Sequence, residues 1–324
     1  MNSAIGGYFE LEFPKPRPFL YPAAYEFQSA RAAFLAQLRA AKPTRVFMPH
    51  YICDSMLSPL EKAGVECCFY FIDSDFNVID DFDFFESDWL FYVNYFGVCG
   101  KNIERLFETY NPLQLILDHS QAFYTPPTNC LATIYSARKF FGVPDGGLLI
   151  TSLPIREPQT IDHGSLARAI PGLTRLAETP EAGYIDYQKS EYTLAQCEPL
   201  KMSHLSRRIL HSVNFESARL RRNENFYFLH LRLGCLNEFS FDLRGIDGPL
   251  CYPFLILSAG LRKFLIGERV FVANYWPEIS GRGRGDCLEM RFARDLLPLP
   301  CDQRYDLQDM QRVAELCLNF LSCK

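Results

Sequence analysis

The chain has 324 residues, of which 48% are hydrophobic, and its formal net charge is −5. This length allows one large domain or two of ordinary size, with a sizeable core. The acidic balance argues against a nucleic acid as the main partner. No apolar run approaches the roughly 20 residues that span a bilayer, so we expect no membrane partner.

The N-terminal residues and the cysteines indicate the cellular compartment in which the protein is expected. The start, MNSAIGGYFELEF, lacks the basic and apolar regions of a signal peptide. The 12 cysteines are scattered, and neither a CxxC pair nor an HxxxH or HxH pair occurs. Such cysteines are most simply reduced thiols, so we expect a cytoplasmic protein without a structural metal.

Residues 1–20 contain GGYFELEF and PKPRPFLYP, whose prolines exclude a regular helix. We expect an extended arm that lies over the domain or reaches towards a partner subunit. The next stretch, QSARAAFLAQLRAA, predicts a helix with Ser29 as its N-cap. The free N–H groups at the start of this helix could hold a phosphate, although every helix has such an end.

Short apolar runs then alternate with helical or loop stretches, which is typical of a mostly parallel sheet covered on both faces. Ligands of such sheets bind at the carboxyl ends of the strands. This arrangement would bring residues 49–51, 94–97 and 118–121 to one rim. No GxGxxG or GxxxxGK[ST] motif indicates a dinucleotide or P-loop site. The predicted strands are 45–49, 67–73, 89–96, 113–118, 131–135 and 147–151.

The segment from Ile134 to Thr151, IYSARKFFGVPDGGLLIT, places Lys139 between two apolar runs and beside Phe140 and Phe141. Burial there would lower the pKa of the lysine and free its amine as a nucleophile. Such an amine forms a Schiff base with a carbonyl such as that of pyridoxal phosphate, PLP. The alternative is a surface lysine on a β-turn, with its stem on the two rings.

Asp118 is the second signal, because it ends the apolar run LQLILD at the expected rim. PLP enzymes of this architecture need an aspartate against the pyridine nitrogen, since the protonated ring is the electron sink. The alternative is an aspartate that caps a turn. Asp118 together with Lys139 is a more specific signal than either residue alone.

In the C-terminal half, apolar runs alternate less regularly with polar segments. Residues 152–193 predict loops and short helices, and one long helical pattern runs from Ser203 to about Leu233. The strand candidates 252–258 and 269–275 and a last helix over 307–321 then predict a smaller domain. The segment GRGRG, 281–285, predicts a flexible basic loop.

The chain resembles the DegT/DnrJ/StrS family of PLP-dependent aminotransferases, of fold type I. QSARAAFLAQL is similar to the family's SGTAAL helix start, and LILDHSQAF is similar to VIEDAAQAH. The triplet at 145–147, Asp-Gly-Gly, stands where the family has Glu-Gly-Gly. The resemblance implies an α/β fold with a large, mostly parallel sheet between helices and a smaller C-terminal α+β domain. It divides the chain into an arm (1–20), a large PLP-binding domain (21–202), and a linking helix with a small domain (203–324).

The resemblance also implies roles for individual residues. Lys139 would be the Schiff-base lysine and proton carrier, and Asp118 would pair with the pyridine nitrogen. Gln121 would lie beside the ring near its phenolic oxygen. Ser29 and Ala30 would offer backbone N–H groups to the phosphate.

Some positions depart from the family pattern. The family's serine five residues before the lysine is Ile134 here, but Ser136 could bind the phosphate instead. The ring-stacking aromatic falls at Cys53 in a gapless match, and Tyr51 could replace it. Lys201 stands where the family often has an arginine or asparagine that reaches the partner subunit's phosphate.

The resemblance therefore implies a homodimeric aminotransferase that uses PLP. It would move an amino group from a donor amino acid, with glutamate expected, to a keto or aldehyde acceptor that could be sugar-derived. The alternatives are another PLP reaction of the lyase type and a catalytically inactive PLP-fold binding or regulatory protein. The arginine that would hold the donor carboxylate remains open; the candidates are Arg282, Arg284, Arg291 and Arg304.

Overall fold

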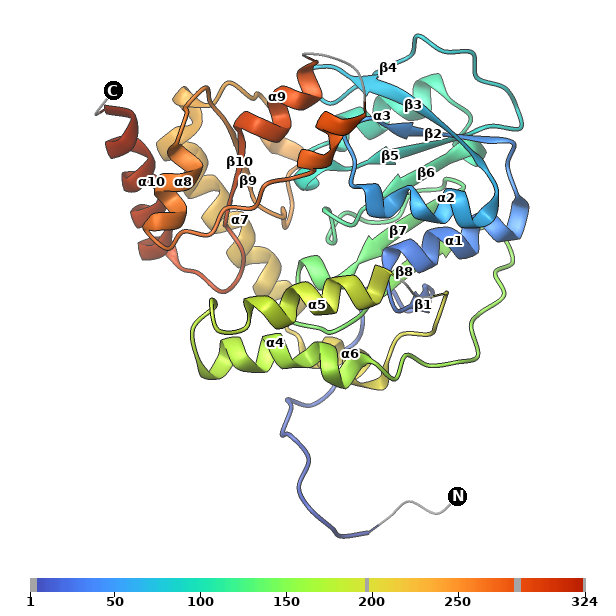
Figure 1. The fold of residues 1–324 in the computed structure, drawn as a ribbon, viewed down its shortest axis with the longest axis horizontal. Helices are drawn as coiled ribbons and strands as arrows, with labels where there is room; N and C mark the ends of the chain where they lie inside the picture. Colours follow the sequence, from blue (N-terminus) through green and yellow to red (C-terminus); the bar gives the residue numbers. More distant parts are fainter. Residues whose placement is uncertain (1–4, 196–197, 283–286, 323–324) are drawn as a thin grey trace.

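The computed structural model describes residues 5–195, 198–282 and 287–322. Its larger part is built on an eight-stranded sheet in the order β1-β8-β7-β6-β5-β2-β3-β4 (Figure 1). The five strands from β7 to β3 are parallel, whereas β1, β8 and β4 run antiparallel to their neighbours. The strands are β1 Tyr25–Phe27, β2 Arg45–Pro49, β3 Glu66–Ile72, β4 Val78–Ile79, β5 Trp89–Val93, β6 Leu115–Asp118, β7 Ala132–Ser136 and β8 Gly147–Thr151.

The six strands predicted between residues 45 and 151 are all present, with ends that shift by a few residues. Every residue of β5, β6 and β7 is buried. Continuous apolar runs suit these positions, because central strands of a parallel sheet are covered on both faces. The predicted strand 89–96 ends earlier, at Val93, because the chain turns at Phe96, whose φ is 56°.

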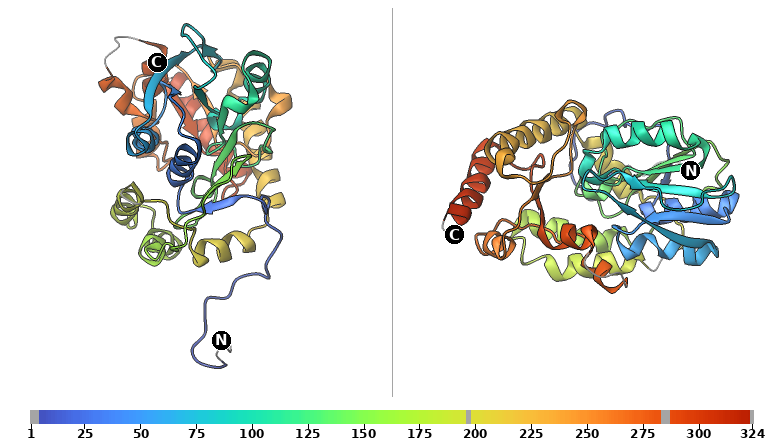
Figure 2. Two further views of the ribbon diagram at one scale, coloured as in Figure 1. Left: turned by 90° about the vertical axis from the view of Figure 1, so that its right-hand side faces the viewer. Right: turned by 90° about the horizontal axis from the view of Figure 1, so that it is seen from above.

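Helices cover both faces of the large sheet. Helices α1 (Ala30–Ala41) and α2 (Ser58–Ala63) lie on one face and α3 (Gly100–Thr109) on the other (Figure 2, right). The predicted N-cap is confirmed, because the Ser29 hydroxyl accepts a hydrogen bond from the N–H of Ala32 at 3.2 Å.

The single helix predicted from Ser203 to Leu233 is wrong. The structure has two helices there, α6 (His204–Ser212) and α7 (Phe215–Leu233), after α4 (Ser165–Ala177) and α5 (Tyr184–Ala195). Asn214 has a non-helical backbone, and its side chain accepts a hydrogen bond from the N–H of Ser217 at 3.2 Å. This cap starts a new helix in a new direction.

The smaller C-terminal part pairs β9 (Tyr252–Leu255) with β10 (Leu296–Leu299) in an antiparallel sheet. The strand predicted at 269–275 is wrong: the segment joins no described strand, and β10 lies beside β9 instead. Arg269, with φ of 62°, turns the chain, and Val270 and Val272 bury their side chains without strand pairing. The helices here are α8 (Leu261–Gly267), α9 (Leu288–Asp295) and α10 (Leu307–Ser322).

The described part of the N-terminal segment, residues 5–20, contains neither helix nor strand and extends away from the body at its start (Figure 1). Its second half lies along α6, where the N–H of Arg17 donates to the carbonyl oxygen of His211 at 2.6 Å. The expected extended conformation is therefore present. Over the described ranges, none of the helices combines the length and apolarity needed to cross a membrane.

Candidate active site

The carboxyl ends of the parallel strands bring three sequence segments together. Asp118 ends β6 and is in register with Val93 of β5 and Ile134 of β7. The N–H of Asn94 donates to the carbonyl oxygen of Asp118 at 3.0 Å. Tyr51, which follows β2, accepts a hydrogen bond on its carbonyl oxygen from the Tyr95 hydroxyl at 2.9 Å. The predicted rim of residues 49–51, 94–97 and 118–121 is therefore confirmed.

Asp118 is a buried carboxylate at the centre of this rim, with 4% of its surface exposed. Its Oδ1 accepts a hydrogen bond from the N–H of Ser120 at 2.8 Å. Burial raises the pKa of Asp118, and the positive charge of Lys139 acts against that increase. A buried carboxylate of this kind is stabilised by a positively charged donor placed against it.

Lys139 lies in a short helical turn, Ala137–Lys139, directly after β7. The expected burial of its amine is wrong for the single chain, because Lys139 is exposed while Phe140 and Phe141 are buried. The two rings belong to a hydrophobic cluster with Phe123 and Phe215. Asp118 at the end of β6 is in register with Ile134 of β7, and the turn that carries Lys139 follows β7 directly, so both residues belong to neighbouring strand ends of the sheet.

Gln121 has 1% of its surface exposed. Its Oε1 accepts a hydrogen bond from the N–H of Phe96 at 2.8 Å and so supports the turn that ends β5. Its buried Nε2 has no acceptor among the described residues. A buried donor without a partner is costly, so this amide group is suited to an acceptor on a ligand.

The start of α1 lies against the start of β8. A Cβ atom at Gly147 would overlap the backbone of Ser29 and Ala30, so only glycine allows this approach. Ser136 is in register with Gly147, which brings its side chain to the same region. The structure thus gathers the three predicted phosphate-binding residues, Ser29, Ala30 and Ser136, although the Ser29 hydroxyl is occupied as the helix cap.

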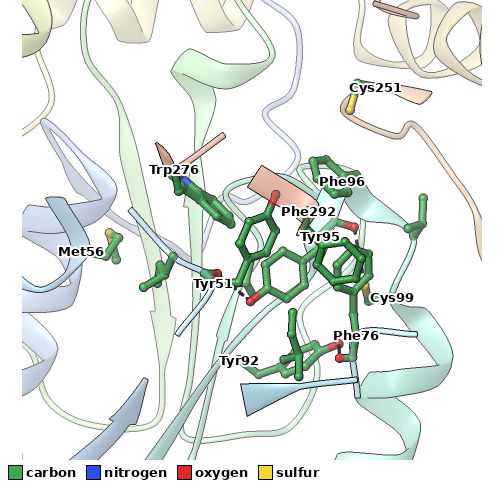
Figure 3. Close-up of a cluster of buried hydrophobic side chains, with 14 of the residues drawn as sticks. Tyr51, Met56, Phe76, Tyr92, Tyr95, Phe96, Cys99, Cys251, Trp276 and Phe292 are labelled. Atoms are coloured by element: carbon green, nitrogen blue, oxygen red, sulfur yellow. Dashed lines mark hydrogen bonds between the residues drawn. The ribbon is translucent and has the colours of Figure 1, made fainter. Parts of the chain in front are cut away.

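Tyr51 points into the core and not towards an open site. Its ring is fully buried among Tyr95, Trp276 and Phe292, with centroid distances of 5.6, 4.7 and 5.6 Å (Figure 3). A ring enclosed in this way has no free face, so its position does not support the stacking role considered from the sequence. Cys53, the other candidate, is half-buried and has no ring.

Lys201 forms an isolated β-bridge with Phe27. Phe27 lies two residues before Ser29, the N-cap of α1. Its ammonium group is paired with the carboxylate of Glu157 at 3.1 Å. Lys201 is therefore near the phosphate-binding residues of its own chain, with its charge engaged at the surface.

Arg282, one of the arginines considered for the donor carboxylate, is engaged within the chain. Its guanidinium donates to the carbonyl oxygens of His50 at 2.6 Å and Ile52 at 2.8 Å, and it also pairs with Asp54. Arg282 directly follows the short helical segment Pro277–Gly281. Its hydrogen bonds therefore attach this segment to the loop after β2. Arg282 thus holds that loop in place.

Two of the other candidate arginines, Arg291 and Arg304, have carboxylate partners as well. Arg304 binds Asp302 through Nε at 2.7 Å and Nη2 at 2.8 Å. Arg291 pairs with Glu238. Arg284 lies outside the described residues.

Sequence reasoning missed Arg222, which lies on α7 with 1% of its surface exposed. Its guanidinium donates to Pro249 O at 2.9 Å, to Gln303 Oε1 at 2.8 Å and to Phe140 O at 3.3 Å. Gln303 Nε2 donates to the same Phe140 oxygen at 2.8 Å. This network fixes the residue after Lys139 to the C-terminal part. Nothing in the sequence separates Arg222 from the other arginines of this helix.

No protein-family model matches the chain, and no curated protein sequence does so either. Several solved structures are similar. DesI, in the presence of its TDP-sugar product, is 19% identical over 91% of this chain and 79% of its own, with a TM-score of 0.63. NtdA from Bacillus subtilis, with bound cofactor PMP, is 13% identical over 92% and 73%, with a TM-score of 0.65. A DegT DnrJ EryC1 StrS aminotransferase from Brucella abortus is 14% identical over 92% and 85%, with a TM-score of 0.59.

At these identities the similarity concerns the fold. The chain has the α/β fold of these aminotransferases, fold type I, with a large mostly parallel sheet and a small antiparallel one. The fold implied by the sequence resemblance is therefore confirmed. Since one fold hosts many activities, function depends on the site residues.

Proposed function

We propose that the chain is a PLP-dependent aminotransferase that transfers an amino group from a donor amino acid, with glutamate expected, to a sugar-derived keto or aldehyde acceptor. The observation that carries the proposal is the placement of buried Asp118 at the end of β6, beside β7, which is followed directly by the Lys139 turn and whose last residue, Ser136, is in register with Gly147 against the start of α1. The similar structures support it, since DesI is described with a TDP-sugar product and NtdA with PMP.

The side chains of the site fit PLP. Asp118 would hold the protonated ring nitrogen, and the orphaned Nε2 of Gln121 would donate to an oxygen of the ring. The first N–H groups of α1 and the hydroxyl of Ser136 would bind the phosphate. Bound PLP supplies an aldehyde that condenses with amines and a ring that takes up the electron pair left when the substrate loses its Cα proton.

Each catalytic residue then has a definite task. With PLP bound, the buried carboxylate of Asp118 would keep the ring nitrogen protonated, because removal of that proton would leave the carboxylate uncompensated in the interior. With PLP bound, Lys139 would carry the proton between the Cα of the substrate and C4′ of the cofactor, as general base and then as general acid. Its exposed position at the end of a helical turn leaves the side chain room to move between these atoms.

The proposal includes a cytoplasmic homodimer. Lys139 is exposed in the single chain, whereas proton transfer at Cα benefits from a site closed to water, and a second copy would provide the cover. Lys201 would then reach the partner's phosphate by leaving Glu157. The described cysteines are free thiols, which agrees with a reducing compartment. A monomer in sedimentation would contradict the dimer.

Borohydride reduction tests the cofactor assignment. The purified protein is incubated with PLP, reduced and digested, and the peptides are mapped by mass spectrometry. We expect a pyridoxyl group on Lys139 and its loss in Lys139→Arg, a variant that keeps the charge. A folded protein with no adduct, or with equal labelling in the variant, would contradict the assignment.

A binding or regulatory protein with the same fold is the second candidate. It is favoured by the enclosed ring of Tyr51, the small side chain of Cys53 and the engaged guanidinium of Arg282. Donor screening separates the two functions. An aminotransferase converts bound PLP to its amine form and releases a keto acid, a lyase releases an elimination or cleavage product, and a binding protein gives no spectral change with any amino acid.

A further inference from the structure

Three side chains capable of binding a metal meet beside the loop after β2. A ring nitrogen of His50, the Sγ of Cys287 and a carboxylate oxygen of Glu289 all lie within 4.8 Å of one another. Imidazole nitrogen, thiolate sulfur and carboxylate oxygen are the donor types of protein zinc sites. Three protein ligands are also the number found in zinc sites that keep one position for water.

The fold holds His50 in place from several sides. The residue directly follows β2 and has 3% of its surface exposed. Its N–H donates to the carbonyl oxygen of Tyr70 at 2.8 Å, and its own carbonyl oxygen accepts from Arg282. Its ring lies 5.0 Å from the ring of Phe71. The imidazole is therefore positioned by neighbours on β3 and by the C-terminal segment.

The other two ligands come from the start of α9. Cys287 is the N-cap residue and Glu289 lies in the first turn, with 1% of its surface exposed. The Oε1 of Glu289 accepts a hydrogen bond from the N–H of Ile72 at 3.0 Å, which seats the turn on the end of β3. Among the residues that the structure describes, no lysine or arginine pairs with Glu289. A cation at the cluster would compensate this buried charge.

We propose that His50, Cys287 and Glu289 bind a divalent transition-metal ion of the zinc type, with a water molecule in the fourth position. Neutral histidine, thiolate and carboxylate together balance the two charges of the ion. Binding releases the proton of the Cys287 thiol to solvent. Because the thiol must lose its proton to bind the ion, the affinity should increase with pH.

Such an ion would join three parts of the molecule. It would attach the start of α9 to the ends of β2 and β3, beside the loop that continues to Tyr51 and Cys53. The sequence showed no paired metal-binding motif, because His50 lies more than two hundred residues before Cys287 and Glu289. This proposal does not depend on the aminotransferase activity.

Zinc binding to the full chain is the test. The purified protein is treated with a chelator, desalted and titrated with zinc alone, and the bound metal is measured by equilibrium dialysis and elemental analysis. We expect about one ion per chain and a rise in Tm with zinc. Cobalt in place of zinc should give the near-ultraviolet absorption of a thiolate ligand.

Matched variants locate the ion. Cys287→Ser and the isosteric Glu289→Gln should each weaken zinc binding at least about tenfold. Cys235→Ser, which removes an exposed thiol far along the chain from the cluster, should bind zinc as the wild type does. Circular dichroism confirms that the variants are folded, and Glu289→Gln carries the test if Cys287→Ser is not. Absence of zinc binding at 1 mM, unchanged binding in Glu289→Gln, or loss of binding in Cys235→Ser would overturn the proposal.

Discussion

The guanidinium of Arg222 lies 4.4 Å from the ring centre of Phe140 and also donates to the carbonyl oxygen of that residue at 3.3 Å. Phe140 directly follows Lys139, and Arg222 belongs to α7, so the contact couples the lysine turn to the C-terminal part. Burial lowers the pKa of Arg222. The buried guanidinium donates four hydrogen bonds to uncharged acceptors, one next to Lys139 and three in the C-terminal part. The position of the lysine turn therefore depends on the sheet part and on the C-terminal part of the chain.

Replacing Arg222 by methionine should therefore destabilise the protein strongly. The variant keeps much of the side-chain volume but leaves the carbonyl oxygens of Pro249 and Leu250 without this donor. We expect a loss of about 3 kcal/mol in the free energy of unfolding, measured with urea. Arg221→Met on the same helix is the control, because Arg221 is half-buried and its ion pair among the described residues is with Glu224 of the same helix. Its effect should stay within about 0.5 kcal/mol.

The sheet and much of the site could be predicted because their signals are local. Continuous apolar runs identify the buried strands, and a parallel sheet brings the residues after those strands to one rim. The position of Asp118 at the end of LQLILD is therefore enough to predict that it lies at the rim. Ser29 is recognisable as a cap because its neighbours have helical spacing.

One error of prediction, the missed break between α6 and α7, is local, and the others occur where non-local contacts decide. The pattern across Leu210 and Phe215 continues smoothly, and only the hydrogen bond from Ser217 to Asn214 reveals a new helix. The segment 269–275 has the composition of a strand, but the place beside β9 belongs to β10. Similarly, the exposure of Lys139 and the burial of Arg222 depend on packing between distant segments.

Gly147→Ala should displace the start of α1. The added Cβ would overlap backbone atoms of Ser29 and Ala30, which cannot move aside as a flexible side chain would. We expect a loss of about 3 kcal/mol in the free energy of unfolding and weaker PLP binding, followed by absorbance. Gly142→Ala is the control, since a Cβ there meets nothing within 4 Å. Equal stability of the two variants would contradict the close approach.

Asp118→Asn should separate cofactor binding from stability. Loss of a charge-assisted hydrogen bond of about 1.5–3 kcal/mol would weaken PLP binding roughly ten- to hundredfold. Without PLP, the substitution should instead increase the stability of the folded chain. Burial raises the pKa of Asp118 above its usual 3.8. As the pH rises through the pKa of the folded state, the buried carboxyl group ionises and the folded chain loses stability.

The asparagine variant avoids this loss and should be more stable than the wild type at pH 7 when both lack PLP. Urea unfolding of the apoproteins at pH 7 and at pH 4 measures the difference, which should shrink at the lower pH. Asp75→Asn, at an exposed position, should change neither stability nor PLP binding. An apo Asp118→Asn variant that is less stable than the wild type at pH 7 would count against a buried, ionised carboxylate.

His119→Phe should make the protein less sensitive to acid. The His119 ring is fully buried beside Tyr135, at 5.4 Å between ring centres, and burial lowers the pKa of His119 from 6.5 to about 4. Between these values the unfolded chain binds a proton that the folded chain does not, so stability falls as the pH falls, by up to about 3 kcal/mol. Phenylalanine keeps a ring against Tyr135 and removes the titration. Urea unfolding from pH 7 to pH 4 should therefore give a flatter profile for His119→Phe than for the wild type, while His163→Gln, at an exposed position, should follow the wild type. Parallel profiles for all three proteins would show that His119 does not titrate in this range.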